Sequence, residues 1–333
     1  MRIYIAAFYQ SRKTQALKGT VFARAASLAD PAYNLESFHY IHKRPEIAAL
    51  LREDKKTIFL DSGAFSMFTQ NVEVDLRSYA RFVYQNKDII HVASNLDAIG
   101  RDKEQLSYDN QKQLETWLKP HGLAVQPVHH VRDKDEWLQR YLDEGYDYIF
   151  LGGMVPENTP HLKEWLDHVW DRYLTDDEGR PKVKVHGFGL TTLDLMFRYP
   201  WYSVDSTSWV MTAMFGAVYV DVLQPDGTVR DYKVDFSSKS KKQQDHDSWH
   251  ITQLDEYTQS AVIKRVEELE SLRPKNPELE KEMEASGGFK QGYNPEALAL
   301  SYGWRDHFNI AYFKRAQQRG VDFFKRKQLT LLM

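Results

Sequence analysis

The first two-thirds of the chain alternates short apolar runs with longer amphipathic segments. In the longer segments, such as DLRSYARFVYQNKD and HLKEWLDHVWDRYL, apolar residues recur every three or four positions, which is typical of helices. The short runs predict buried strands at residues 3–8, 57–60, 89–94, 123–127, 148–151, 182–186 and 201–204. This alternation indicates an α/β fold. A (β/α)8 TIM-type barrel fits it best, and a doubly wound open sheet is the alternative.

The pattern changes after residue 215. The segment AVYVDVLQPDGTVRDYKVDF alternates with period two on both sides of Pro225-Asp226-Gly227, which predicts a hairpin, and DEYTQSAVIKRVEELESL predicts a helix. Residues 273–295 are rich in Pro, Glu, Lys and Gly and predict a mobile connection before a long helical stretch. We therefore expect three parts: a barrel core at 1–225, a charged insertion at 226–297, and a terminal helix at 298–333 that packs back on the barrel.

Composition narrows the class of protein. The 333 residues are 42% hydrophobic and 27% charged with a formal net charge of −3, so any site for a polyanion must be a local basic patch. The absence of cysteine excludes disulfides, thiol catalysis and cysteine-based zinc sites. The opening MRIYIAAFYQ lacks the apolar length and cleavage site of a secretory signal, and no apolar run approaches the roughly 20 residues that span a bilayer. We expect a soluble, cytoplasmic protein.

Six consecutive predicted strands end in small, polar or acidic residues. In βα folds the carboxyl ends of the strands form the active site, so these ends are expected to meet on one rim. The residues at these ends are Asp61-Ser62-Gly63-Ala64-Phe65-Ser66, Asn95 with Asp97 and Gly100, Gln126 with His129 and His130, Gly152-Gly153-Met154, His186-Gly187-Phe188-Gly189, and Asp205-Ser206-Thr207.

Each of these ends also has a simpler local explanation. An acidic residue followed by serine, as at Asp61 or Asp205, is common in turns and at helix N-caps. Gly152-Gly153 permits a tight loop. His129 and His130 point in different directions on a strand, and without a matching carboxylate cluster we favour surface or capping roles over metal ligation. No complete dinucleotide-binding, P-loop, GxSxG or HExxH motif is found.

Taken in order, the rim motifs resemble those of the tRNA-guanine transglycosylase (queuine tRNA-ribosyltransferase) family. The segments LDSGAFSMF, NLDAIG, VQPV, FLGGMVPE, HGFGLTTLDLM and YSVDSTSW occur in the family's order, and HFNIAYFKRAQQ is similar to its terminal helix. The resemblance covers roughly residues 55–215 and 300–327. It implies a (β/α)8 barrel, in agreement with the independent count of βα units, and exchange of guanine in a nucleic acid for a free 7-deazaguanine base without a cofactor.

The resemblance also assigns roles to particular residues. It implies that Asp205 is the nucleophile on C1′ of the sugar and that Asp61 is the general acid and base. Base recognition is assigned to Asp97, Gln126 and the backbone at Gly153, with Phe65 and His186 as walls of the base pocket. The remaining substrate-binding positions that it implies are Ser62, Gly152, Met154 and Gly187. Two carboxylates suit a double displacement at an oxocarbenium-like centre, and a flat, polar pocket suits a base drawn out of its stack.

Departures from the family point to its DNA-modifying branch. The family's tRNA enzymes carry a Cys3His zinc site, which this cysteine-free chain cannot form, and Ala64 and Ser66 replace a glycine and a glutamine of the first motif. Basic residues that are candidates for binding a nucleic acid backbone are Lys239, Lys241, Lys242, Lys314, Arg315 and Arg319, although a solvated charged face explains them equally well.

We therefore predict a DNA-guanine transglycosylase that installs preQ0 or a related 7-deazaguanine base. A virus-encoded enzyme that acts in a host cytoplasm is compatible with this branch. The alternatives are a zinc-free tRNA-guanine transglycosylase, a non-catalytic subunit that positions nucleic acid, and an unrelated barrel glycosidase or nucleosidase. Because Asp61 and Asp205 are both present, the non-catalytic alternative is disfavoured. The family often dimerises through the region that is replaced here, so a homodimer stays open.

Overall fold

The structure, a computed structural model, describes all residues except 156, 191, 241–247, 288–291 and 332–333, and it does not describe the side chains of 321–331. The chain divides into two compact units. The first comprises residues 1–10, 33–206 and 320–333, and the second comprises residues 11–32 and 207–319. This division differs from the expected one in two respects: the chain changes unit at 206/207 rather than at 225, and segment 11–32 belongs to the second unit.

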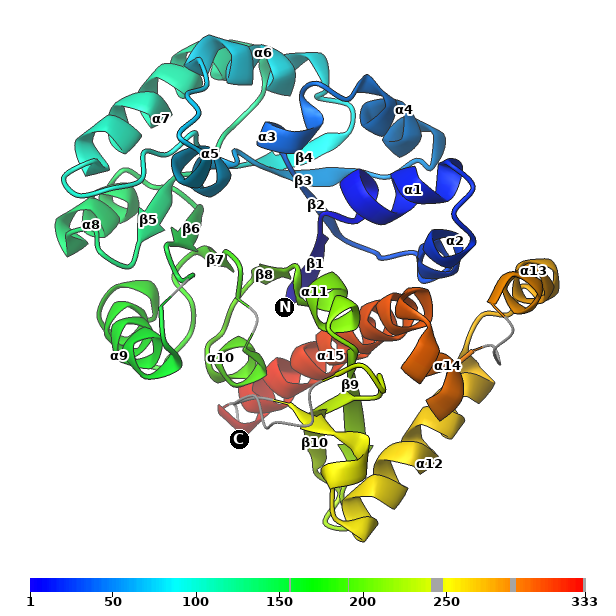
Figure 1. The fold of residues 1–333 in the computed structure, drawn as a ribbon. Coiled ribbons are helices and arrows are strands. Elements are labelled where there is room, and N and C mark those ends of the chain that lie inside the picture. Colours follow the sequence, from blue (N-terminus) through cyan, green and yellow to red (C-terminus); the bar gives the residue numbers. More distant parts are fainter. Residues whose placement is uncertain (156, 191, 241–247, 288–291, 332–333) are drawn as a thin grey trace. The chain divides into compact units, whose positions relative to one another are not determined.

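The first unit is built on a curled, all-parallel sheet of eight strands, which is compatible with a TIM-like fold (Figure 1). Its strands follow the order β4-β3-β2-β1-β8-β7-β6-β5, so the first strand pairs with the last, and β4 and β5 are the two outer strands. An isolated parallel bridge between Ser94 and Gln126 connects the segments beside the two outer strands. The strands are β1 (Arg2–Ala6), β2 (Asn34–Ser37), β3 (Ile58–Asp61), β4 (Ile90–Ala93), β5 (Val128–His130), β6 (Tyr148–Gly152), β7 (Lys184–Gly187) and β8 (Ser203–Ser206).

Helices connect the successive strands, and Figure 1 shows α4, α6, α7 and α8 on the outer side of the curled sheet. The predicted amphipathic segments are confirmed as helices. The acidic residue expected to open one of them, Asp75, caps α6 by accepting a 3.0 Å hydrogen bond from the Ser78 N–H. The helices of this unit are α3 (Phe38–Ile41), α4 (Pro45–Glu53), α5 (Ala64–Gln70), α6 (Leu76–Gln85), α7 (Glu104–Leu118), α8 (Asp135–Asp143), α9 (Thr159–Val169) and α10 (Leu193–Arg198).

Two strands differ from the sequence prediction. The fifth, predicted at 123–127, is displaced to Val128–His130. The second, β2, was missed because three of its four residues are polar, although Asn34 and Glu36 are almost completely buried. The Glu36 carboxylate accepts hydrogen bonds from the N–H groups of Tyr9 (2.6 Å) and Gln10 (3.2 Å), and burial raises its pKa to about 8. A strand whose buried polar groups are satisfied in this way leaves no apolar run to recognise.

Aromatic side chains fill the interior of the curled sheet. Tyr4, Phe59, Tyr148 and Phe150 belong to one buried cluster. The Phe59 and Phe150 ring centroids lie 4.9 Å apart, and the Tyr4 and Phe59 rings meet edge to face at 5.3 Å. Because this packed core fixes the strands relative to one another, it also fixes the positions of the residues at their carboxyl ends.

The described residues of the second unit form a three-stranded sheet and seven α-helices or parts of α-helices. The predicted hairpin is confirmed: β9 (Ala217–Leu223) and β10 (Val229–Asp235) pair antiparallel, and the Gln224 N–H donates to the Thr228 carbonyl at 2.7 Å across the turn. The predicted terminal helix is interrupted at Ser301, which separates α14 from α15. The other elements are α1 (Thr14–Leu17), α2 (Val21–Ser27), α11 (Ser208–Met214), β11 (Trp249–His250), α12 (Glu256–Leu272), α13 (Pro277–Gly287), α14 (Pro295–Leu300) and α15 (Tyr302–Leu331).

Part of the segment predicted as a mobile connection is folded. Helix α13 lies within it, with Leu279 and Met283 buried in the core of the second unit. The Arg273 side chain, only 1% exposed, forms ion pairs with Glu270 (2.8 Å) and Glu280 (2.7 Å) and lies 4.5 Å from the Trp304 ring. Buried ion pairs of this kind order a segment whose composition alone indicates a loop.

Replacing Arg273 with Ala is expected to destabilise the protein by about 3–5 kcal/mol, because two carboxylates lose their buried partner. Urea unfolding should report this as a lower transition midpoint. Lys275, half exposed and paired with the same Glu270, provides the matched control, and Lys275→Ala is expected to cost less than about 1 kcal/mol. Equal effects of the two substitutions would show that the buried arrangement around Arg273 is not a stabilising element.

Candidate active site

The carboxyl ends of the parallel strands bring the predicted site residues to one rim of the first unit. Asp61 is the last residue of β3, and His130 is the last residue of β5. The strand register pairs Ser37 with Asp61 and His130 with Gly152, so neighbouring strands end at matching levels. Asp205 lies in β8, opposite Tyr4 of β1.

Asp61 has a strongly perturbed proton affinity. Burial, together with the negative charges of Asp97 and Asp205, raises its pKa to about 7. The Gly63 N–H donates a 3.1 Å hydrogen bond to Oδ2 and opposes this shift. The three carboxylates therefore act on one another electrostatically, and Asp61 can hold a proton near neutral pH.

The turn that follows Asp61 depends on glycine. Gly63 has φ = +80°, and a Cβ atom there would lie 2.5 Å from the His39 Cβ and 2.6 Å from the Ser37 Oγ. Ser62 is completely buried: its N–H donates to the Ser94 Oγ at 2.9 Å, and its hydroxyl donates to the Asp97 Oδ1 at 3.2 Å. Ser62, predicted to contact substrate, thus contacts the proposed base-reading carboxylate.

The second carboxylate, Asp97, is paired with a histidine that the sequence analysis did not place in the site. The His130 Nε2 lies 2.9 Å from the Asp97 Oδ2, and its Nδ1 lies 3.4 Å from the Asp133 Oδ2. Burial disfavours the imidazolium, but the two carboxylates outweigh it and raise the pKa of His130 to about 10. Protonated His130, at the end of β5, therefore orients Asp97 and balances part of the acidic charge on the rim.

The double glycine provides the space for this histidine. A Cβ atom on Gly152 would lie 2.9 Å from the His130 Cδ2, and one on Gly153, where φ is +71°, would lie 3.3 Å from the His130 Cβ. Gly153 is exposed and its backbone is accessible, whereas Gly152 and Met154 are buried. The close approach of the His130 ring is thus one physical reason for Gly-Gly at the end of β6.

Asp205 is held from two directions. Its Oδ1 accepts a 2.8 Å hydrogen bond from the Gly189 N–H and lies 3.3 Å from the His186 Nε2. The other ring nitrogen of His186 is 2.7 Å from the Ser203 Oγ, which in turn is 2.6 Å from the Tyr148 hydroxyl. This series of polar contacts runs from the core of the sheet to the carboxylate and fixes its orientation.

Three predicted substrate contacts have packing roles instead. His186, predicted as a wall of the base pocket, is completely buried among Phe59, Phe150 and Phe188, and burial lowers its pKa, so it supports Asp205 from behind. Gly187 is buried, and it packs so closely against Trp201 that a Cβ atom there would lie 3.1 Å from the Trp201 ring. The Met154 side chain is 3% exposed. A strand-end position alone did not reveal which of these side chains turn inward.

Two other predicted contacts are placed where a ligand can reach them. The Phe65 side chain on α5 is 49% exposed, as a stacking residue requires. Gln126 is partly buried, and its backbone forms the bridge to Ser94 with an N–H donated to Ala93 (2.9 Å) and a carbonyl that accepts from Asn95 (2.8 Å). The bridge places the Gln126 backbone beside Asn95, two residues before Asp97.

The two adjacent histidines are expected to differ in charge over the whole neutral range. His129, completely buried with its ring stacked 6.2 Å from Trp165, has a pKa lowered to about 4 by burial, whereas that of His130 is raised to about 10. A ¹⁵N NMR titration of histidine-labelled protein should find His130 protonated and His129 neutral from pH 5 to pH 9. The stabilisation from His130 is full below its unfolded pKa of about 6.5 and is lost as pH rises towards 10. Titration of both rings near pH 6.5 would contradict this.

The predicted basic face of the terminal helix is largely engaged within the second unit. Arg315 pairs with Asp221 at 2.7 Å, and Arg319 pairs with Asp231 at 2.8 Å. Lys314 is exposed, and its ammonium group donates to the carbonyl of Ala29 at 3.0 Å. The charges of the two arginines are thus already opposed by aspartates of β9 and β10, and their role in binding a nucleic acid backbone stays a prediction. Lys241 and Lys242 lie outside the described residues.

In the part of the chain that the structure describes, no group of three or more His, Asp or Glu side chains has an arrangement suited to a metal ion. None of its helices is long and apolar enough to cross a membrane.

No protein-family model matches the chain, and comparison with curated proteins finds no match.

Proposed function

We propose that the protein is a guanine transglycosylase that exchanges guanine in DNA for a 7-deazaguanine base. One observation carries this proposal: Asp61, Asp97 and Asp205 act on one another at a single rim, and Asp61 has a pKa of about 7. A carboxyl group that exchanges its proton near neutrality, beside a second carboxylate fixed by Gly189, provides an acid and a nucleophile in one place.

The chemistry requires two displacements at one carbon. In the first, a carboxylate oxygen of Asp205 bonds to C1′ of the deoxyribose as the C1′–N9 bond to guanine breaks, and protonated Asp61 gives its proton to the departing base. In the second, Asp61 takes a proton from the incoming 7-deazaguanine, whose N9 then bonds to C1′ as the C1′–O bond to Asp205 breaks. Each step inverts C1′, so the overall exchange retains configuration and leaves the phosphodiester backbone intact.

Recognition of the base is assigned to the neighbouring strand ends. Asp97 accepts hydrogen bonds from the guanine edge, and His130 at 2.9 Å keeps it oriented and charged. The exposed backbone at Gly153 and the amide of Gln126 complete the polar edge, and the exposed Phe65 ring stacks on the base. A purine shares this hydrogen-bonding edge with a 7-deazapurine, so the same pocket serves both the leaving and the incoming base.

The finer architecture forms part of the same proposal. The first unit is a closed (β/α)8 barrel in which the Ser94–Gln126 bridge completes the ring between β4 and β5. The hairpin and helices after residue 207 take the place of the zinc-bearing region of the tRNA enzymes. The ion pairs of Asp221 with Arg315 and Arg265 supply there part of the cross-linking that a metal provides elsewhere.

The proposal is tested by incubating the protein with radiolabelled preQ0 and either duplex DNA, single-stranded DNA or tRNA, followed by digestion to nucleosides. Labelled 7-deazaguanine deoxynucleoside from DNA is the expected product. Incorporation into tRNA alone would replace DNA by tRNA as the substrate. Release of free guanine without incorporation would identify a hydrolase, and no reaction with any of these nucleic acids would overturn the proposal.

A further inference from the structure

The second unit contains a large cavity whose charge is opposite to that of the whole chain. Its volume is about 1210 Å³, and among the described residues four basic side chains line it against one acidic side chain, a formal net charge of +3. The whole chain has a formal net charge of −3. The charged lining residues are Arg12, Lys233, Asp235, Lys239 and Arg305. A cavity with this imbalance attracts anions.

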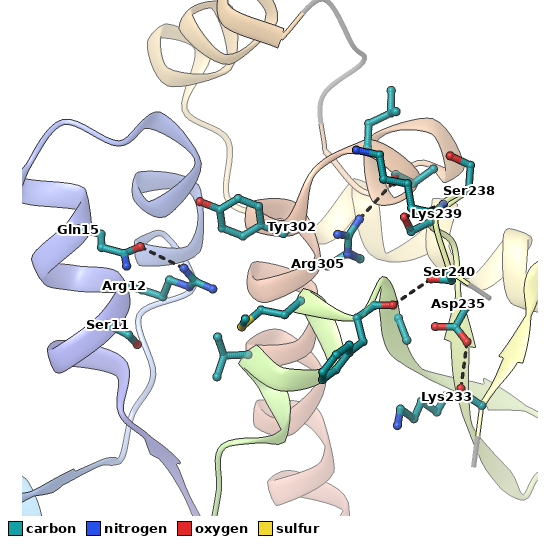
Figure 2. A pocket seen from close by; sticks show the side chains of 18 residues that line it. Ser11, Arg12, Gln15, Lys233, Asp235, Ser238, Lys239, Ser240, Tyr302 and Arg305 are labelled. Carbon is teal, nitrogen blue, oxygen red and sulfur yellow. Dashed lines mark hydrogen bonds between the residues drawn. The ribbon is translucent and has the colours of Figure 1, made fainter. Parts of the chain in front are cut away.

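Two of the cations are built into the wall. Arg305 is 6% exposed and donates hydrogen bonds to the carbonyls of Ala213 (2.7 Å) and Leu298 (2.6 Å), which are neutral acceptors. Arg12, also 6% exposed, pairs with the buried Asp306 at 2.5 Å, and its guanidinium lies 5.0 Å from the Tyr302 ring. Figure 2 shows Arg12, Tyr302 and Arg305 around the cavity. The guanidinium charge of Arg305 is therefore desolvated without direct neutralisation by a carboxylate.

The other two cations come from the hairpin and the loop that follows it. Lys233 lies on β10, and Lys239 lies in the loop after it (Figure 2). In the described part of the chain no carboxylate lies within ion-pair distance of either ammonium group, while the one acidic lining residue, Asp235, accepts a 2.9 Å hydrogen bond from the Ser248 hydroxyl. Two flexible ammonium groups thus face the cavity without a compensating anion.

The loop that carries Lys239 is a hydroxyl-rich wall with a defined shape. Ser237, Ser238 and Ser240 all line the cavity. The Ser240 hydroxyl donates to the Phe215 carbonyl at 2.9 Å, and Gly216, with φ = +101°, allows the loop to pack so closely that a Cβ atom would lie 2.6 Å from the Ser237 Cβ. Because the proton of the Ser240 hydroxyl is already donated to Phe215, the hydroxyls of Ser237 and Ser238 are the donors suited to phosphate oxygens.

Large apolar side chains complete the lining. Met214, Phe215 and Leu300 line the cavity and are 60%, 70% and 55% exposed. An inorganic anion makes no favourable contact with such an apolar surface. A ligand with a flat base binds it favourably, because every base can stack on an aromatic ring. The combination of cations, hydroxyls and an exposed ring is suited to a nucleotide.

We propose that this cavity binds a nucleotide, with its phosphate at Lys233, Lys239 and the serine loop and its base against Phe215. Arg305 provides positive potential behind the phosphate, whereas the charge of Arg12 is compensated by Asp306. The nucleotide is either free or a unit of a nucleic acid strand, and the two sources share this chemistry. All the residues that line the cavity belong to the second unit. The nucleotide proposal therefore does not rest on the transglycosylase proposal.

The test compares two charge-matched double variants of the full chain. Lys233→Gln with Lys239→Gln alters the cavity. Lys264→Gln with Lys281→Gln removes the same charge from exposed positions on α12 and α13. Binding of dGMP is measured by calorimetry, and binding of a single-stranded DNA dodecamer is measured by fluorescence anisotropy. We expect the cavity variant to lose roughly tenfold or more in affinity and the control to lose little.

The two probes distinguish the sources. Cavity-dependent binding of dGMP identifies a free nucleotide as a ligand. Cavity-dependent binding of the dodecamer alone identifies a strand, and the slope of log K against log salt should then fall by roughly 1.4 for the two lost contacts. The proposal is overturned when wild type binds neither probe, or when the cavity variant and the control behave alike.

A second pair of variants tests whether the base of the nucleotide stacks on Phe215. Phe215→Ala is expected to weaken binding of the same nucleotide probe roughly five- to hundredfold, since a stacking surface is lost. Tyr257→Ala removes an aromatic ring that is 64% exposed on α12, outside the cavity, and should have no effect. Unchanged binding by Phe215→Ala would show that the cavity does not hold the base, and would overturn the nucleotide assignment.

Discussion

Replacing Asp205 with Asn is expected to reduce base exchange at least about 10⁴-fold, because the substitution removes the only oxygen nucleophile that the proposed mechanism uses. The amide has the size of the carboxylate, and its carbonyl oxygen can still accept the hydrogen bond that the Gly189 N–H donates. The melting temperature should therefore change little. Exchange is measured as incorporation of labelled preQ0 into DNA.

The same variant tests the covalent step directly. Wild-type protein mixed with DNA in the absence of a free base should form a protein–DNA adduct that survives denaturing electrophoresis, whereas Asp205→Asn should form none. Asp194→Asn is the control, because this carboxylate is exposed on α10 and pairs with Lys163 at the surface. Persistence of exchange or of the adduct in Asp205→Asn would remove Asp205 from the role of nucleophile.

The rhythm of apolar and amphipathic segments was sufficient to predict the curled parallel sheet. Seven of its eight strands have an apolar run in or near the observed positions, and the order of strands follows from the order of βα units. The same rhythm placed Asp61, Asp97 and Asp205 on one rim, because the carboxyl ends of parallel strands must meet. Their mutual electrostatic influence agrees with that placement.

The remaining differences have a common physical cause, which is that the burial of a polar group depends on its partners. Glu36 is hidden in β2 because the backbone of Tyr9 and Gln10 satisfies it. His130 enters the site because Asp97, distant in sequence, and Asp133, three residues further along the chain, meet its two ring nitrogens. No local pattern records such long-range pairs. A histidine at a strand end, taken together with Gly-Gly at the next strand end, is the signal that was available.

The charge of the terminal helix illustrates the same limit. Arg315 and Arg319 form a basic pattern along the sequence, yet each is opposed by an aspartate on the hairpin. Lys239 has the same charge but lines a cavity in which basic groups outnumber acidic ones. Sequence identifies where positive charge is available, and only the packing of the hairpin against the helix decides which charges are left for a ligand.

Replacing Asp61 with Asn is expected to slow base exchange by about 10²–10⁴-fold, because the departing guanine loses its proton donor. The pH dependence identifies the role. In wild type, release of labelled guanine in a single turnover should fall as pH rises through about 7, where Asp61 loses its proton. The residual activity of Asp61→Asn should lack this step, and a variant that keeps the wild-type profile would assign the titration to another group.

Stability gives a second and independent measure of the same carboxyl group. Its pKa is about 7 in the folded protein and 3.8 as the ordinary value, so the folded state binds the proton more tightly and wild type loses stability as pH rises from about 4 to 7. Asn carries no charge at any pH. Asp61→Asn should therefore be more stable than wild type at pH 8, by about 2 kcal/mol given the partial exposure of the group, and this difference should shrink as pH falls from 7 towards about 4. Asp194→Asn, at the surface, should show no such dependence. Lower activity together with higher stability at high pH is the result expected if Asp61 is a buried proton donor. If Asp61 had only a structural role, the substitution would lower both activity and stability.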